Sequence, residues 1–309
     1  MQLQVKSTYT LLESTTKITD LVTAAKARGY QSLALTDKNV VYGLVDFYKA
    51  AKAADIKPLL GITIEVGGLF QTDERFPLIL LAKNLTGYQN ILKISTKIMT
   101  QSELVPFEAV QSLLQQLVVI TPSQDGELVR LLLQNDATPA QTYIEQLKAV
   151  TDADSLYLGI SAKQAASQQR VPLGQLSQQT AVPLVALGDV RYLEPEDAFA
   201  VQVLQHIKAG TQVNLQTPQA SGGYFLEDAQ QVTAAFEALQ LAEAVANTQK
   251  IAAQCQVDLS FKRAQLPQFE TPAGQSAAVY LKQQSQAGLQ ARFNKQSIPE
   301  AYQTRLDYE

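Results

Sequence analysis

Short apolar segments, typical of buried strands, recur along the first 190 residues of the chain and alternate with amphipathic stretches. This alternation limits the fold more than any other feature, because it is the pattern of strand and helix units built around a parallel sheet. Seven such units with short connections favour an α/β fold with a closed or nearly closed barrel, and an open doubly wound sheet is the alternative. The expected strands are Gln2–Lys6, Ser32–Asp37, Pro58–Val66, Pro77–Lys83, Leu117–Thr121, Ser155–Ser161 and Pro183–Leu187.

The segments between the expected strands have helical periodicity. Residues Ile18–Arg28 have one apolar face, and Gly29 supplies a stop signal at the C-terminal end. The segment Tyr42–Ala53 follows the same pattern. We therefore expect helices around the outside of the strands.

The character of the sequence changes after Asp189, where no convincing strand follows. Three segments rich in Ala, Gln and Glu predict a helical extension: Pro195–Ala209, Leu226–Leu239 and Gln240–Gln256. The prolines and glycine of Ala264–Gln275 indicate a linker, and Ala277–Phe293 is expected to be a helix. We expect a barrel core in residues 1–193, a helical extension in 194–263, and a linker with the first helices of a following domain in 264–309. The abrupt end of the chain predicts a fragment of a longer protein.

The charge of the chain is close to balanced. It has 25 basic and 29 acidic residues, a formal net charge of −4 and a pI near 5.2, so overall charge does not draw it to nucleic acid or anionic lipid. No apolar segment approaches the roughly 18 residues of a membrane span, and the N-terminus has no apolar core of a secretory signal. The sequence therefore predicts a cytoplasmic protein with no membrane partner.

Histidine and cysteine are almost absent. The single cysteine, Cys255, excludes a disulfide framework, and with the single histidine, His206, it cannot form a zinc site of the usual Cys/His kind. Neither residue lies in a motif for nucleophilic catalysis. Composition therefore argues against most hydrolytic chemistry.

Charged residues follow several expected strands. Because the carboxyl ends of parallel strands form the functional face of such folds, the carboxylates Asp37 and Asp189 should face the cations Lys6, Lys38 and Arg191 around one rim. One interpretation is a pocket for an anion or phosphate ester. The other, which we favour, is a set of internal salt bridges. A hard divalent metal on Asp37, Asp189, Glu13 or Glu65 is a third possibility, which the three neighbouring cations disfavour.

Other ionisable residues have simpler interpretations. Asp152 and Asp154 resemble the paired carboxylates of two-metal sites, but they precede an expected strand and so lie at the opposite face, where turn chemistry explains them. His206 fits a partly buried helical position, and Cys255 fits a small apolar residue on a helix face.

Several sequence segments, in order, resemble the PHP (polymerase and histidinol phosphatase) domain that begins bacterial DNA polymerase III alpha subunits of the DnaE type. The likeness covers essentially the whole chain. It is carried by QVKSTYTLL from Gln4, SLALTD from Ser32, GLVDFYKAA from Gly43, IKPLLG from Ile56, LLAKN from Leu80, GDVRYL from Gly188, GYFL from Gly223 and RLDYE from Arg305. The resemblance implies a distorted barrel of seven parallel strands with a helical C-terminal extension. Residues 264–309 would then lead towards the polymerase palm, which is itself absent.

Active members of this family bind a metal cluster through histidines, carboxylates and a cysteine at the strand ends. The resemblance places two retained carboxylates, Asp37 and Asp189, among the ligand positions, and the other positions have lost ligand chemistry: Gln4, Lys6, Lys38, Thr63, Pro77, Ser123, Gly159 and Arg191. We therefore expect no catalytic residue and no metal in this chain. We expect an ion-pair network of Lys6, Asp37, Lys38, Asp189 and Arg191 in their place, since a cation beside a buried carboxylate restores the charge balance.

The resemblance implies a structural and protein-docking module of a replicative polymerase. The parent protein would extend primers on template DNA with Mg²⁺ held in its palm, and no cofactor is expected in this chain. The implied partners are the palm and thumb of the same polymerase, a separate proofreading exonuclease such as some members dock, and other replisome subunits. Two alternatives remain: an active metal-dependent 3′–5′ exonuclease or phosphoesterase, and a stand-alone barrel enzyme for a phosphorylated small molecule.

Overall fold

The structure is a computed structural model that describes residues 1–134, 137–213, 222–261, 269–294 and 296–309. These residues form two compact units, Met1–Leu259 and Ser260–Glu309. No helix within these ranges is both long and apolar enough to cross a membrane.

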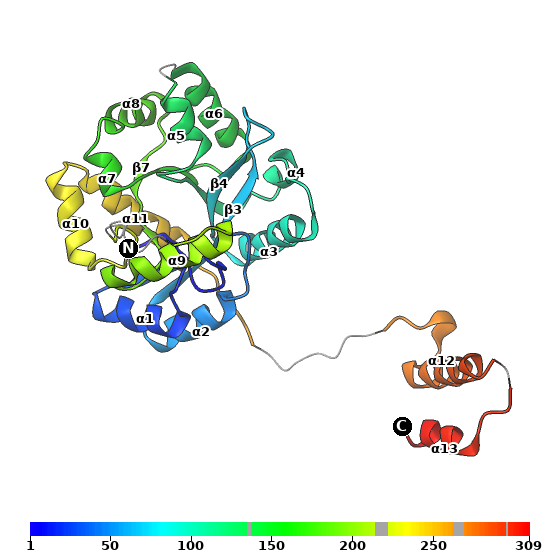
Figure 1. The fold of residues 1–309 in the computed structure, drawn as a ribbon. Coiled ribbons are helices and arrows are strands. Elements are labelled where there is room, and N and C mark those ends of the chain that lie inside the picture. Colours follow the sequence, from blue (N-terminus) through cyan, green and yellow to red (C-terminus); the bar gives the residue numbers. More distant parts are fainter. Residues whose placement is uncertain (135–136, 214–221, 262–268, 295) are drawn as a thin grey trace. The chain divides into compact units, whose positions relative to one another are not determined.

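The first unit is built on a curled sheet of six strands (Figure 1). Every residue of the strand Leu117–Thr121 is buried, as expected for a strand that is covered on both faces. The strands lie side by side in the order β2 (Ser32–Leu35), β3 (Lys57–Gly67), β4 (Arg75–Ala82), β5 (Leu117–Thr121), β6 (Leu156–Ile160) and β7 (Leu184–Ala186).

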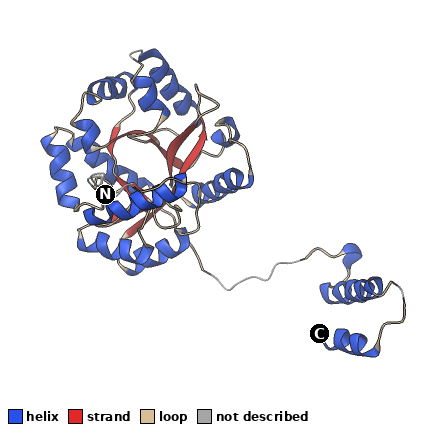
Figure 2. Cartoon of the chain, viewed as in Figure 1, coloured by secondary structure: helices blue, strands red, loops and turns tan. Residues whose placement is uncertain are grey.

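Two short strands bring the edges of this sheet together. β1 (Gln4–Val5) pairs in parallel with β8 (Asp189–Val190), which follows β7 after two residues. The bridge between Gln2 and Leu33 connects the β1 segment to β2. The result is the predicted α/β fold of barrel type, with strands around the centre and helices outside (Figure 2).

One strand departs from the predicted all-parallel arrangement. β4 runs antiparallel to both of its neighbours, β3 and β5. Residues 68–74, which join β3 to β4, are too few for the crossover helix that a parallel connection needs, so the chain turns back as a hairpin. The β8 strand is a second difference, because the sequence predicted no strand beyond Leu187.

Helices form the outer layer of the first unit. α1 (Ile18–Ala27) and α2 (Leu44–Ala53) occupy the two helical segments predicted near the N-terminus, and α1 ends before Gly29, whose φ of +77° suits glycine. The helices that follow are α3 (Leu85–Thr100), α4 (Glu108–Gln111), α5 (Glu127–Leu132), α6 (Ala137–Val150), α7 (Ala162–Ala165) and α8 (Arg170–Thr180).

The three predicted helices of the extension are also present. They are α9 (Ala198–Ala209), preceded by the 3₁₀ turn η1 (Pro195–Asp197), then α10 (Ala229–Ala238) and α11 (Ala242–Gln254). An isolated bridge between Tyr192 and Phe225 is the β pairing described within this segment. In Figure 1, α9 lies across the front of the barrel.

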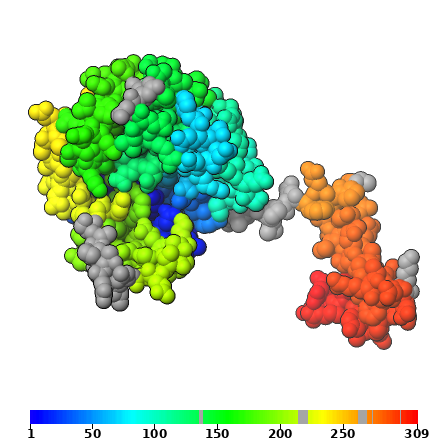
Figure 3. Space-filling view, turned by 45° about the horizontal axis from the view of Figure 1, so that its top comes forward, coloured from blue at the N-terminus to red at the C-terminus, as the bar shows by residue number. Residues whose placement is uncertain are grey.

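The core has two parts because strand side chains alternate between two faces. Leu60, Ile62 and Leu80 pack with the outer helices. Leu59, Ile79 and Leu81 instead point into the barrel, where they form a second cluster with Val118, Ile120 and residues of the last helix and its end, Ile251, Ala252 and Cys255. α11 and its C-terminal end therefore help to fill the barrel interior. Residues 1–7 are buried, and only a small blue area of the N-terminal segment is visible in the space-filling view (Figure 3).

The second unit contains the 3₁₀ turn η2 (Pro272–Gly274), α12 (Ala277–Arg292), which matches the predicted helix, and α13 (Glu300–Tyr308). Neither helix has a buried residue. Phe293 and Tyr302 meet edge to face with ring centroids 5.1 Å apart. The predicted linker falls partly outside the described residues, and the division of the chain lies between Leu259 and Ser260.

Candidate functional site

A cavity of about 570 Å³ lies at the carboxyl ends of the parallel strands, and we call it the barrel mouth. Four uncharged residues of its lining were not considered in the sequence analysis: Pro122, Gln124, Gln205 and Ala209. Its lining includes eight of the ten positions derived from the family resemblance: Gln4, Lys6, Lys38, Thr63, Pro77, Ser123, Asp189 and Arg191. It also includes five charged side chains that the sequence analysis left out of the network: Glu13, Glu65, Arg75, Asp125 and Lys208.

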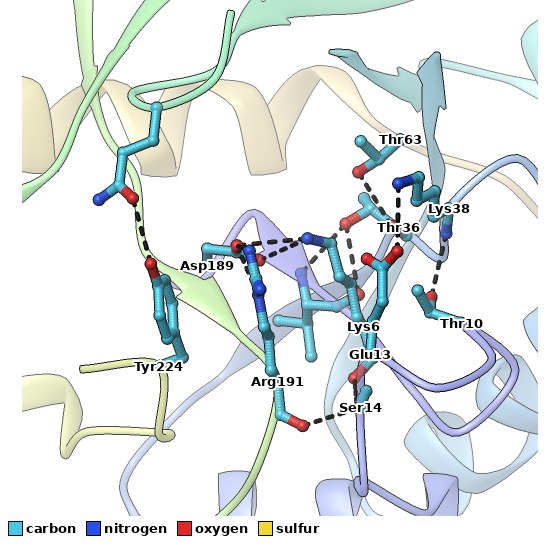
Figure 4. Close-up of polar contacts among 12 residues, drawn as sticks. Lys6, Thr10, Glu13, Ser14, Thr36, Lys38, Thr63, Asp189, Arg191 and Tyr224 are labelled. Atoms are coloured by element: carbon cyan, nitrogen blue, oxygen red, sulfur yellow. Dashed lines mark hydrogen bonds and ion pairs between the residues drawn. The ribbon is translucent and has the colours of Figure 1, made fainter. Parts of the chain in front are cut away.

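One half of the mouth is built on the β1–β8 pair. Gln4 and Asp189 are register partners, and the two-residue period of a strand places Lys6 and Arg191 on the same face as these two residues. Lys6 Nζ lies 3.0 Å from Asp189 Oδ1, and Arg191 Nε donates a hydrogen bond of 2.8 Å to Asp189 Oδ2 (Figure 4). Asp189 is therefore shared by two cations.

The charges of this trio stabilise one another. Burial alone would favour the protonated form of Asp189, but Lys6 and Arg191 outweigh burial and hold the pKa of that carboxyl below its usual value. Burial likewise opposes the charge on Arg191, and Asp189 outweighs it, so the pKa of the guanidinium is raised. The Arg191 guanidinium also stacks over the Tyr224 ring, with 4.4 Å to the ring centroid. The sequence analysis did not find Tyr224.

The other half of the mouth is centred on Lys38. Its Nζ lies 3.1 Å from Glu13 Oε1 and 2.5 Å from Glu65 Oε1, and Lys208 of α9 forms a further ion pair with Glu13. Burial opposes ionisation of Glu13, but Lys208 and Lys38 outweigh it and lower the pKa of Glu13 to about 2. The sequence analysis considered Glu13 and Glu65 only as metal ligands. In the structure they are partners of Lys38.

Asp37 departs from the expected network. It is 1% exposed and forms no ion pair within the described part of the chain. Its carboxylate instead accepts hydrogen bonds from the Ser7 backbone N–H at 2.6 Å, from the Ser7 hydroxyl at 2.7 Å and from the Thr10 hydroxyl at 2.7 Å. Burial dominates over these bonds and raises the pKa of Asp37. The loop after β1 therefore satisfies Asp37 without a cation.

Gly159 also lies outside the mouth, on β6. A Cβ atom at this position would lie 2.4 Å from the Thr121 carbonyl oxygen and 2.7 Å from Leu187 Cδ2. The close contact with backbone leaves no space for a longer side chain in this structure. A carboxylate at this position would require the neighbouring strand to move.

The remaining ionisable residues of the sequence analysis have structural contacts. Asp152 accepts hydrogen bonds from the Gln116 backbone N–H at 2.8 Å and from Lys83 Nζ at 3.0 Å. His206 lies on α9, and its Nδ1 is 2.8 Å from the hydroxyl of Thr211, which follows that helix; Cys255 is buried among apolar residues. None of these three residues lines the barrel mouth.

The side chains at the mouth do not fit a metal cluster. Within the described ranges, no group of three or more His, Cys, Asp or Glu side chains is placed to hold a metal ion. Carboxylates are present at the mouth, but Asp189, Glu13 and Glu65 already face ammonium or guanidinium groups. A metal ion bound there would be repelled by Lys6, Lys38 and Arg191.

Comparisons with known proteins identify the family. The model of the PHP domain matches residues 2–163. DNA polymerase III subunit alpha of Bacillus subtilis is 36% identical to this chain over 100% of the chain and 27% of its own length. The same subunit of Halalkalibacterium halodurans is 34% identical over 98% of the chain and 27% of its own length. The chain thus spans about a quarter of these relatives. An amidohydrolase structure from Chromobacterium violaceum covers 62% of this chain and 87% of its own, at 10% identity and a TM-score of 0.41. The chain belongs to the PHP domain family and is similar to the N-terminal region of DNA polymerase III subunit alpha.

Proposed function

We propose that this chain is a noncatalytic PHP domain of a replicative DNA polymerase III alpha subunit, acting as a structural and protein-docking module in the cytoplasm. The similarity to two alpha subunits over nearly the whole chain supports the parent protein. The observation that carries the noncatalytic role is the pairing of mouth carboxylates with cations, Asp189 with Lys6 and Arg191 above all.

The charge pattern explains how the barrel is stable without a metal. A buried carboxylate without a counterion is costly, and removing one partner of a buried pair is strongly destabilising. Lys6 and Arg191 neutralise Asp189, and Lys38 with Lys208 neutralises Glu13 and Glu65. These cations stand at or beside positions that the family resemblance assigns to metal ligands. The ion pairs supply the positive charge that a metal would otherwise supply.

The whole polymerase sets the partners in this proposal. The palm and thumb of the same chain would contact this domain, and the palm would hold the Mg²⁺ ions that catalyse primer extension on template DNA. A separate proofreading exonuclease and other replisome subunits are further candidates for docking. The share of each relative that the chain covers, about a quarter, supports a role as one module of a larger polymerase.

A nuclease assay tests the absence of catalysis. The purified 309-residue chain is incubated with a labelled primer–template and with a chromogenic phosphomonoester, in separate reactions with Mg²⁺, Mn²⁺ and Zn²⁺. We expect no release of nucleotide or phosphate above background. Metal-dependent release that disappears in Asp37→Asn, with an unchanged far-UV circular dichroism spectrum, would refute the proposal in favour of an active phosphoesterase.

The structural role is tested in the full-length alpha subunit. We expect Asp189→Asn to lower the melting temperature of the polymerase and to inactivate it sooner at elevated temperature, while activity at low temperature is kept. Asp154→Asn is the matched control, because Asp154 is exposed in a turn with φ of +56°, where asparagine is equally suitable. Equal melting temperatures for the two variants would contradict a supporting role for the mouth.

A further inference from the structure

The helix α9 covers one side of the barrel mouth but packs loosely there. It lies across the front of the barrel (Figure 1), and its residues Gln205, Lys208 and Ala209 line the cavity. All residues of α9 are described by the structure, and among them only Val201 is buried. The Oε1 atom of Gln202 is also enclosed, without a hydrogen-bond partner in the described ranges. Buried polar groups nearly always have a partner, so the seated position of α9 carries a cost that contact with water would remove.

The two ends of α9 are held unequally. Just before its N-terminal end, the Arg28 guanidinium donates a hydrogen bond of 2.7 Å to the Leu193 carbonyl oxygen and lies 2.5 Å from the Glu194 carboxylate. At the C-terminal end, α9 reaches the barrel through one ion pair within the described ranges, between Lys208 and Glu13. The helix is therefore anchored at one end and tied at the other by a single pair of charges.

The Lys208–Glu13 ion pair can break without leaving a buried charge. The Lys208 side chain is 48% exposed, so its ammonium passes into water when the pair separates. Glu13 then still has Lys38, whose Nζ lies 3.1 Å from Glu13 Oε1. Breaking an ion pair is expensive when it strands one charge inside the protein, and here neither charge is stranded. Pairs with a partly exposed partner are also weakened by salt.

We propose that α9 is a hinged lid over the barrel mouth, anchored beside Arg28 and held closed by the Lys208–Glu13 ion pair. Rising ionic strength screens this pair and lets the C-terminal half of α9 lift. A helix of 12 residues is marginal in water by itself, so the lifted part loses helical hydrogen bonds. This inference goes beyond the noncatalytic module proposed above and does not depend on it, because it concerns access to the mouth and not the role of the parent protein.

Thiol labelling of the 309-residue chain measures the opening of this lid. Ser123 lines the mouth and is 7% exposed, and the single natural cysteine, Cys255, is buried, so Ser123→Cys supplies a thiol that reports on the mouth. Iodoacetamide is the reagent because it is uncharged, and a chelator keeps metal from the new thiol. Adding Lys208→Met removes the ammonium and keeps a side chain of similar length. We expect labelling about fivefold faster in Lys208→Met at low salt. Salt of about 1 M should speed labelling of Ser123→Cys towards the same rate and leave Lys208→Met unchanged.

Two matched variants in the Ser123→Cys chain separate the lid from other causes. Arg75→Gln removes a mouth cation that lies on β4 and forms no ion pair within the described ranges, and Lys208→Arg keeps the charge that pairs with Glu13. Both should label as Ser123→Cys alone does. Hydrogen exchange at residues 203–209 should be faster in Lys208→Met, which loss of a covering side chain alone would not cause. The proposal is overturned if Lys208→Met and salt leave the labelling rate unchanged, if Arg75→Gln or Lys208→Arg speeds labelling equally, or if exchange at residues 203–209 stays the same.

Discussion

Asp189→Asn removes the one carboxylate that Lys6 and Arg191 share. The two cations then remain at the mouth without their counterion, at 7% and 15% exposure. Removing one partner of a buried ion pair lowers the free energy of unfolding by about 3–5 kcal/mol. Because these side chains keep limited access to water, we expect a loss of about 3 kcal/mol. For a unit of this size that corresponds to a melting temperature lower by roughly 6–12 °C.

The pH dependence gives a second signature of the same charge. The pKa of Asp189 is lower in the folded state than its unfolded value of about 3.9. Its stabilisation is therefore fully present above about pH 4 and is lost as the pH falls through the folded pKa. We expect the difference in unfolding free energy between the unchanged chain and Asp189→Asn to be constant near neutral pH and to shrink in acid.

Urea unfolding followed by far-UV circular dichroism measures this difference, because the chain has no tryptophan for fluorescence. Asp154→Asn is the control and should change the unfolding free energy by less than about 0.5 kcal/mol. A loss below about 1 kcal/mol for Asp189→Asn, or a loss that is the same in acid as at neutral pH, would show that Asp189 does not depend on the two cations.

Three further predictions follow from single residues. Glu13→Gln should lower the free energy of unfolding by about 2 kcal/mol once solvent screening is allowed for. Because the pKa of Glu13 is lowered to about 2, this difference from the unchanged chain should hold above about pH 4.5 and diminish below it. Urea unfolding at a series of pH values measures it. Burial raises the pKa of the Cys255 thiol to about 12, so a thiol reagent at pH 8 should label it only upon unfolding, and rapid labelling of the folded chain would contradict its burial. Glu127→Gln should lower the free energy of unfolding by about 2 kcal/mol and speed amide hydrogen exchange at residues 69–71, because the Glu127 carboxylate accepts hydrogen bonds from the backbone N–H groups of Leu69, Phe70 and Gln71. Exchange rates at these residues equal to those in Glu108→Gln, a variant at an exposed glutamate, would contradict this.

Local patterns predicted the strands because their composition leaves few choices. Leu117–Thr121 is a short segment of four apolar residues and a threonine, four of the five residues are β-branched, and its bounds are those of β5. Strand direction is not a local property, so the antiparallel β4 was missed. The signal available was the short connection of residues 68–74, which cannot contain a crossover helix.

The mouth shows the same division between local and distant information. The two-residue period places Lys6 beside Asp189 once β1 and β8 are neighbours, and that neighbourhood follows from closing the barrel. Lys208 could not be found by pattern, because it reaches Glu13 from α9, far along the chain. The hydroxyl partners of Asp37 depend on how the loop after β1 folds back, and Ser7 and Thr10 carry no sequence signal for that role.

The metal content of the purified chain tests most directly whether cationic side chains stand in for metal at the barrel mouth. The chain is incubated with Zn²⁺, Mn²⁺ and Fe²⁺, dialysed without chelator and measured by inductively coupled plasma mass spectrometry beside the Asp189→Asn and Asp37→Asn variants. Charge compensation by Lys6, Lys38 and Arg191 predicts only trace metal in all three proteins. Stoichiometric metal that survives dialysis in the unchanged chain and is lost in either variant would contradict it.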